Sequence, residues 1–117
     1  MLGATLALAT INIIESQDLC NRANNLQVIM RNHMQSIAQH TGALTNIRGI
    51  GALVAADIVL PGNNSRLGYT LYQEAVKLGA LLRPLGNTIY WIPPLTISDK
   101  TLQDLKDITL QALINLT

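Results

Sequence analysis

The segment from residue 16 to residue 40 restricts the fold more strongly than any other, because its pattern predicts a single long amphipathic helix. Ser16 belongs to the residue types that cap helix N-termini, and Gly42 stands where a left-handed residue would end the helix. One face recurs at three- and four-residue steps: Leu19, Ala23, Leu26, Met30, His33 and Ile37. A helix of this length with one apolar face needs a flat surface to cover, so the sequence predicts a small sheet beneath it.

Glycine and proline mark the ends of the predicted strands. Residues 46–60 (NIRGIGALVAADIVL) are rich in small and β-branched types and are apolar on both faces, which predicts one strand covered on both sides. A short strand is expected at residues 80–83 and another at residues 88–92. The turn PLGN separates these two, and Pro93 and Pro94 close the second.

Two further helices complete the predicted fold. Ser65 can cap a helix over residues 65–77 that Gly79 ends, and Ser98 can cap the last helix. The inner face of the first is expected to hold Leu71, Tyr72, Ala75 and Leu78, and that of the second Leu102, Leu105, Ile108, Ala112 and Leu116. The order of elements predicts an α/β (α+β) two-layer fold, with helices packed on one face of a small sheet.

The N-terminal segment is unusual for a surface helix. Residues 2–15 are small or aliphatic nearly all round, which predicts a helix packed on several sides. A bilayer span takes about 20 apolar residues, and no basic residue precedes the apolar stretch, so neither a membrane span nor a signal peptide is expected. Only 13% of the chain is charged, against roughly 25% in an average soluble domain. We therefore expect a partner to cover part of its surface.

Charge and composition argue against nucleic acid as a partner. The formal net charge is +1 without a basic run, and the aromatic residues are one Trp and three Tyr, too few for base stacking.

The single cysteine, Cys20, has neither a disulfide partner nor metal-ligand spacing. It fits a reducing compartment and is expected to be a buried helix thiol.

No set of residues assembles a catalytic or metal site. His33 and His40 lie seven residues apart, not the four that let two helical histidines share a metal. His33 is expected to be half-buried, and His40 to act as a cation near the end of its helix. Asp99, Asp104 and Asp107 alternate with lysines, which predicts a solvated helix face. No metal site is therefore expected.

Arg83 is the candidate binding residue. It lies in LLRPLGNTIYWIPPLTIS, before a proline that fixes the chain direction. A guanidinium in apolar surroundings needs an acceptor, and its rigid fork of donors fits a carboxylate. From the residues alone two interpretations stay open: Arg83 binds the carboxylate of a ligand, or it pairs internally with Asp57 or the chain terminus.

The same segment resembles a motif of a known family. LLRPLGNTIYWIPPLTIS is similar to the R-P-x-G-x-x-I-Y-x-x-P-P segment of class III, fold-type I pyridoxal-phosphate aminotransferases. Arg83-Pro84 followed by Ile89-Tyr90 favours the branch that acts as adenosylmethionine-8-amino-7-oxononanoate aminotransferase. LGATLALATINIIES resembles the helix between the family's large and small domains, and NIRGIGALVAADIV resembles its V-R-x-x-G strand, with Asp57 in place of Glu. The resemblance covers the whole chain.

The resemblance implies that the chain is a piece of a longer enzyme. Residues 1–15 would be the linking helix from a missing upstream large domain, and residues 16–117 the C-terminal small domain of a fold-type I transferase. The full enzyme would be a cytoplasmic homodimer. It would use pyridoxal 5′-phosphate to transfer the amino group of S-adenosylmethionine to 8-amino-7-oxononanoate in biotin synthesis. Arg83 would bind the carboxylate of this keto-acid substrate, while Tyr90 and Trp91 are expected to pack the strand.

In the family the cofactor lysine and the elements that hold the cofactor's ring and phosphate precede the matched segment. None of Lys77, Lys100 and Lys106 lies in the family's lysine motif, so no catalytic or cofactor-binding residue is expected and the isolated chain is expected to be inactive. Met1 stands where the family has proline, which suggests a truncation, a split gene or an expressed fragment. Two alternatives remain: the small domain of another class III omega-aminotransferase, and a stand-alone α/β carboxylate-binding domain.

Overall fold

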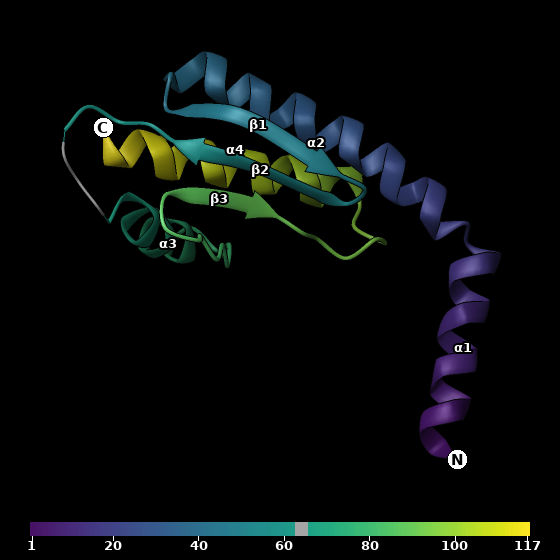
Figure 1. Cartoon of the computed structure of the whole chain (residues 1–117). Helices are drawn as coiled ribbons and strands as arrows, with labels where there is room; N and C mark the ends of the chain where they lie inside the picture. The colour runs from purple at the N-terminus through teal and green to yellow at the C-terminus, as the bar shows by residue number, and fades with distance from the viewer. Residues whose placement is uncertain (63–65) are drawn as a thin grey trace.

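A three-stranded antiparallel sheet with helices on one face forms the body of the molecule (Figure 1). The computed structural model describes residues 1–62 and 66–117. Its elements are α1 (Leu2–Ser16), α2 (Leu19–Thr41), β1 (Leu44–Ile50), β2 (Leu53–Ile58), α3 (Leu67–Lys77), β3 (Thr88–Trp91) and α4 (Asp99–Leu116). Helices α2 and α4 contact each other behind the sheet, and α3 contacts α4. The predicted two-layer fold is confirmed.

The long amphipathic helix exists, but it starts later than predicted. Ser16 is the last residue of α1 and caps nothing, whereas α2 begins after Asp18, whose φ of 50° is left-handed. This break turns the chain sharply between α1 and α2 (Figure 1). At the other end, Gly42 adopts a φ of 64° and donates its N–H to the Ala38 carbonyl, as a left-handed C-cap does. The prediction for Gly42 is therefore confirmed.

The buried face of α2 differs from the predicted face at one position. Leu26, Met30, Met34 and Ile37 are fully buried, while His33 is half-buried as predicted. Met34 follows Met30 by four residues and completes the stripe, because side chains four apart lie on the same side of a helix. Cys20 was expected to be buried but is exposed, since it lies one helical step away from Leu19.

Residues 46–60 form a hairpin and not the single strand that was predicted. β1 pairs antiparallel with β2, and Ile50 faces Leu53 across a turn at residues 51–52. Gly51 has a φ of 54°, which glycine adopts without a steric penalty and which a tight hairpin turn requires. The apolar character on both faces had concealed this turn. A shift in register between Thr45 and Arg48 places Asn46 at a φ of 51° in a bulge.

One face of the sheet is buried under the helices and the other is open. Val54 lies opposite Trp91 and Ala56 opposite Ile89, and these four side chains are buried. The alternate pairs, Ala55 with Tyr90 and Asp57 with Thr88, lie on the open face. The prediction of a strand at residues 80–83 is wrong, since this segment pairs with no strand in the described part of the chain.

The last two helices begin and pack largely as the pattern predicts. Ser98 accepts a hydrogen bond from the Thr101 N–H at 3.1 Å and so caps α4. Leu102 and Ala112 are fully buried, but so is Thr109, whose hydroxyl donates to the Leu105 carbonyl. The hydroxyl is thereby satisfied within its own helix. The other buried residues are Leu113 in α4 and Leu67, Gly68, Leu71 and Ala75 in α3. The predicted cap Ser65 lies outside the described residues.

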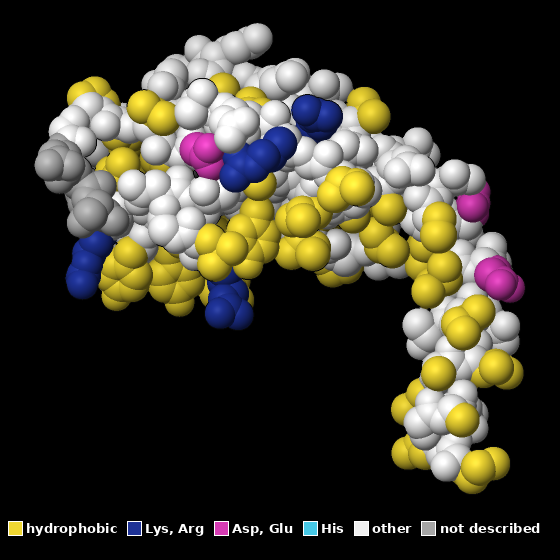
Figure 2. Space-filling model, in the orientation of Figure 1, with side chains coloured by type: hydrophobic (Ala, Val, Ile, Leu, Met, Phe, Trp, Pro, Cys, Tyr) yellow, Lys and Arg dark blue, Asp and Glu magenta, His cyan; other side chains and the backbone are white. Residues whose placement is uncertain are grey.

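Helix α1 forms as predicted, yet no residue of it is buried within this chain. It projects from the body, and Figure 2 shows hydrophobic side chains on both of its visible sides. Leu2, Leu6, Leu8 and Ile11 are each more than half exposed. Exposed apolar side chains gathered on one helix are typical of a surface that a partner covers. Among the described residues, no helix is long and apolar enough to cross a membrane.

Truncation of the Met34 side chain tests the packing of α2. We expect Met34→Ala to lower the free energy of unfolding by about 2–5 kcal/mol, because it removes a fully buried side chain and leaves a cavity. Val28→Ala is the matched control: Val28 is 60% exposed on the same helix, so its change should stay within about 0.5 kcal/mol. Urea unfolding followed by circular dichroism measures both. Equal losses would contradict this placement of Met34.

Candidate carboxylate-binding site

Arg83 lies in the extended segment between α3 and β3. Ala80 and Leu82 turn into the core, while Leu81 and Arg83 point outward and are exposed. This alternation is the period of an extended chain, so the buried Leu82 anchors the segment and presents its neighbours to the surface. Pro84 follows and fixes the backbone at the next position.

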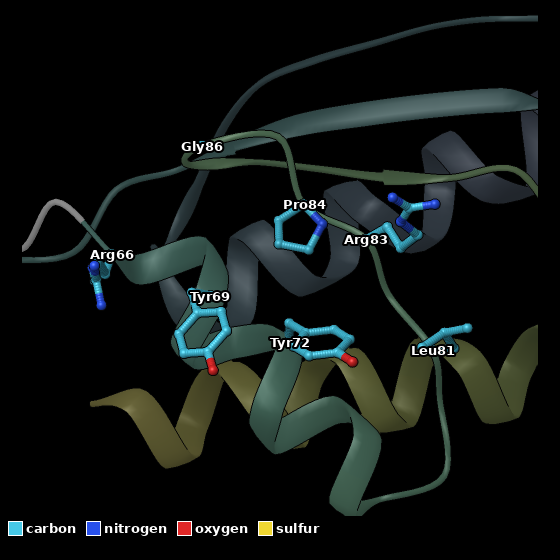
Figure 3. Close-up of a pocket in the computed structure, with 7 residues that line it drawn as sticks. All are labelled: Arg66, Tyr69, Tyr72, Leu81, Arg83, Pro84 and Gly86. Atoms are coloured by element: carbon cyan, nitrogen blue, oxygen red, sulfur yellow. The ribbon is translucent and has the colours of Figure 1, made fainter.

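A pocket of about 500 Å³ adjoins Arg83 (Figure 3). Its lining comes from the first turns of α3 and from the segment before β3: Arg66, Tyr69, Tyr72, Leu81, Arg83, Pro84 and Gly86. The rings of Tyr69 and Tyr72 lie 6.2 Å apart between centroids and tilt by 30°. Figure 3 shows Arg66 and Arg83 on opposite sides of the two rings. The pocket thus combines aromatic and aliphatic walls with a guanidinium on either side.

Arg83 forms no ion pair and no side-chain hydrogen bond with any residue that the structure describes. The internal pairing with Asp57 or the chain terminus, one of the two sequence interpretations, is therefore wrong. Asp57 is occupied on the open face of the sheet, where Arg48, Asn46 and Thr88 surround it. The guanidinium of Arg83 keeps all its donors for another acceptor.

The Asp57 cluster secures the start of β3. Its carboxylate accepts hydrogen bonds from Asn46 at 2.9 Å, Thr88 at 2.7 Å and Arg48 at 3.1 Å. These bonds, led by that from Asn46, lower the pKa of Asp57 from 3.8 to about 2. Thr88 is the first residue of β3 and follows the turn that begins after Arg83 and Pro84. The cluster therefore fixes one end of the Arg83 segment to the sheet.

Tyr90 and Trp91 line a second cavity, of about 290 Å³, that Arg83 also borders, whereas His33 does not line it. His33 is half-buried on α2, and this burial, followed by the Lys106 charge, lowers the pKa of His33. Trp91 is 1% exposed and packs the core, as expected, while Tyr90 is half-buried on the open face. Within residues 1–62 and 66–117 no group of three or more His, Cys, Asp or Glu could hold a metal ion.

Sequence reasoning missed the contribution of α3 to the pocket. Tyr69 and Tyr72 lie three residues apart on a helix that ends just before the Arg83 segment. The three-residue step places both rings on the same side of α3. The hydrophobic pattern assigned Tyr72 to the core, whereas it is half-buried and lines the pocket.

The lysines do not form a covalent cofactor site. A lysine that binds a carbonyl cofactor needs a pocket that lowers its pKa. Lys77 is exposed and paired with Glu74 at 2.7 Å, and Lys100 is exposed and paired with Asp104 at 3.7 Å. Lys106 lies on α4, and none of the three lines the pocket next to Arg83. The residues of this chain therefore do not fit a pyridoxal-phosphate attachment site.

Comparison with known proteins places the chain among transaminases. The family model described as aminotransferase class-III matches residues 1–113. The 4-aminobutyrate aminotransferase of Mycobacterium tuberculosis H37Rv is 31% identical over 116 residues, covering 94% of this chain and 26% of that protein. The adenosylmethionine-8-amino-7-oxononanoate aminotransferase of Synechococcus elongatus is 30% identical over 106 residues, covering 89% of this chain and 24% of that protein. The chain thus spans about a quarter of the length of these relatives.

Solved structures agree with this placement. The acetylornithine aminotransferase from Elizabethkingia anophelis superposes with a TM-score of 0.83 at 27% identity, over 93% of this chain and 28% of that chain. A transaminase solved with L-alanine superposes with a TM-score of 0.85 at 23% identity, over 97% of this chain and 28% of that chain. At that lower identity the second match supports the fold alone.

The acidity of Asp57 is open to direct measurement. Because its pKa is lowered in the folded chain, its contribution to stability is complete above pH 3.8 and is lost as the pH falls towards about 2. Asn46→Gly removes the leading hydrogen bond and keeps a residue that accepts a positive φ. We expect it to move the Asp57 midpoint upwards, towards 3.8, in a carboxyl-detected NMR titration. An unchanged midpoint would refute the role of Asn46.

Proposed function

This chain belongs to the class-III aminotransferase family, and we propose that it is the C-terminal small-domain portion of an aminotransferase that converts 8-amino-7-oxononanoate to 7,8-diaminononanoate. In this proposal S-adenosylmethionine donates the amino group and the reaction belongs to biotin synthesis. The observation that carries the proposal is Arg83, an exposed guanidinium that pairs with none of the residues in the described part of the chain and lines a pocket with apolar walls. Its segment also resembles the motif in which that branch of the family binds the substrate carboxylate.

The proposed role of Arg83 is to bind and position the keto acid. A guanidinium donates two parallel hydrogen bonds to a carboxylate, which fixes orientation as well as position. Leu81, Tyr72 and Pro84 supply apolar surface next to it, which suits the aliphatic chain of an oxononanoate. Holding the far end of the substrate lowers the entropic cost of bringing its ketone to the reacting centre.

In this proposal the residues that bind the cofactor lie outside this chain. Pyridoxal 5′-phosphate acts as an electron sink for amino transfer, while the protein orients the substrates. Since the lysines of this chain do not fit its attachment, a missing upstream large domain is the proposed source of the cofactor site. On this basis the isolated chain is inactive in amino transfer.

The proposed assembly follows from the exposed first helix. We assign residues 1–15 to the link with the upstream large domain and residues 16–117 to the small domain. The apolar surface of α1, none of it buried in this chain, supports a covering partner. A cytoplasmic homodimer of the complete enzyme remains part of the proposal.

A second candidate is another class-III omega-aminotransferase. The 4-aminobutyrate aminotransferase relative is as similar to this chain as the oxononanoate relative is, at 31% against 30% identity. That substrate also carries a carboxylate, so Arg83 would retain its role. The two candidates differ in the amino donor, and the donor pocket is not in this chain. Comparing S-adenosylmethionine with 4-aminobutyrate as amino donors for the complete enzyme would decide between them. A stand-alone carboxylate-binding domain is less well supported, because it leaves α1 without a partner.

Replacement of Arg83 tests the proposal. In the complete enzyme we expect Arg83→Ala to raise KM for 8-amino-7-oxononanoate about 10- to 100-fold, because a charge-assisted hydrogen-bonded pair contributes about 1.5–3 kcal/mol. KM for S-adenosylmethionine should change little. Arg31→Ala, in α2 and not among the residues that line the pocket, serves as the matched control. Equal losses for both substrates would reject Arg83 as the carboxylate ligand.

Cofactor labelling tests the proposal that the upstream portion, and not this chain, binds the cofactor. The purified chain is mixed with pyridoxal 5′-phosphate and reduced with borohydride, and peptides are mapped by mass spectrometry. We expect no specific label at Lys77, Lys100 or Lys106, because none lies in a pocket next to Arg83. Activity should appear only when the upstream portion is supplied. Stoichiometric labelling of a single lysine would show that the chain holds its own cofactor.

A further inference from the structure

The turn that follows Arg83 is held from several directions. Residues 85 and 88 exchange two backbone hydrogen bonds of 2.9 Å, which close the turn before β3. The Asn87 carbonyl accepts from the Ile58 N–H at 2.7 Å, which ties the turn to the end of β2. The Asn87 side-chain oxygen accepts from the Gly68 N–H at 3.4 Å, which ties it to the first turn of α3. The turn therefore bridges the sheet and α3.

Gly68 lies in direct contact with this turn and leaves no room for a side chain. A Cβ at this position would overlap the Gly86 carbonyl oxygen and would come within 3.0 Å of Pro84 Cβ and 3.1 Å of the Gly86 carbonyl carbon. Backbone atoms cannot rotate away as the end of a long side chain can. By contrast, a Cβ at Gly3 in α1 would have no atom within 4 Å. The requirement for glycine is thus local to the contact with the turn.

A larger residue at position 68 would displace the turn and not α3. Helix α3 is fixed by Leu67, Leu71 and Ala75, which belong to the core cluster. Leu85 at the tip of the turn is 72% exposed, and Gly86 is exposed as well. A side chain at position 68 would therefore push the turn outward. Pro84 belongs to the same contact and is bonded directly to Arg83, so the displacement reaches the guanidinium.

We propose that Gly68 is a positioning residue for Arg83. Because Gly68 has no side chain, α3 contacts the Pro84–Gly86 turn directly, and this contact determines the position of the Arg83 guanidinium in the pocket. This inference rests on the proposed carboxylate-binding role of Arg83. Gly68 touches no ligand itself and acts through the backbone of the turn. The bidentate geometry of an arginine with a carboxylate makes binding sensitive to a displacement on the order of 1 Å, which can cost up to about 100-fold.

The test compares two acceptors in the complete enzyme: 8-amino-7-oxononanoate, and an analogue of the same length that ends in a methyl group instead of a carboxylate. We expect Gly68→Ala to raise KM for the carboxylate acceptor about tenfold, as partial misplacement of the ligand predicts. KM for the methyl-ended analogue should be unchanged. Val76→Ala is the matched control and should alter neither value, since Val76 lies on the same helix, is 45% exposed and does not line the pocket.

A double substitution separates positioning from general damage. If Gly68 acts through Arg83, then Gly68→Ala should have no further effect on KM once Arg83→Ala is present. A penalty that persists in the Arg83→Ala background, or one that is equal for both acceptors, would overturn the inference. If Arg83→Ala itself shows no preference for the carboxylate acceptor, the proposed function fails and the inference fails with it. The two failures are therefore distinguishable.

A second variant covers the case in which Gly68→Ala does not fold. Asn87→Ala removes the acceptor of the Gly68 N–H without adding atoms and loosens the same contact. We expect a KM increase for the carboxylate acceptor of about threefold. This is smaller than the increase for Gly68→Ala, because losing one hydrogen bond costs less free energy than a steric overlap with the backbone. No change, or an equal change for the methyl-ended analogue, would count against the role of this contact.

Discussion

The contact between α2 and the inner face of the sheet is the interaction on which the rest of this structure depends. Met30, Met34 and Ile37 from α2 join the same buried cluster as Val54 and Ala56 from β2. Because side chains alternate along a strand, burying Val54 and Ala56 turns Ala55 and Asp57 to the open face. The register of β3 follows, since Trp91 and Ile89 must meet the same helices. A slip of one residue would bury Asp57 and expose the core.

That constraint reaches the candidate site through β3. Thr88 lies opposite Asp57 and bonds to it, so the strand starts at a defined place on the sheet. The turn before it is then bounded by the sheet on one side and by Gly68 of α3 on the other. Arg83 is consequently presented by a segment whose two ends are both fixed, although the residue itself is exposed. The position of Arg83 is therefore set by the elements that fix the ends of its segment, and not by contacts of the Arg83 side chain.

Sequence patterns predicted where helices and strands form better than they predicted which elements pair or pack together. The helical period, the Gly42 and Ser98 caps and the strand at β3 depend on residues close in the chain, and these predictions were confirmed. The hairpin was missed because no Asn-Gly or Asp-Gly pair marks the turn between β1 and β2, which instead depends on the positive φ of Gly51. The strand expected at residues 80–83 did not form because a strand needs a hydrogen-bonded neighbour, and none of the described strands lies beside this segment. The pocket was hidden because it joins α3 to a later segment, although Arg83 itself was identified from its local chemistry.

The exposure of Arg83 has a consequence for affinity. A guanidinium in water binds a carboxylate weakly, because solvent screens the charges and competes for the hydrogen bonds. The same pair becomes much stronger where a low-dielectric surface excludes water. Tyr69, Tyr72 and Leu81 supply apolar surface in one cavity beside Arg83, and Tyr90 and Pro93 in a second, but Tyr69 and Leu81 are each more than half exposed. Strong carboxylate binding therefore requires a second surface over this pocket, just as the uncovered apolar side chains of α1 require one. The exposed pocket beside Arg83 and the uncovered helix α1 are both features that a covering surface would complete.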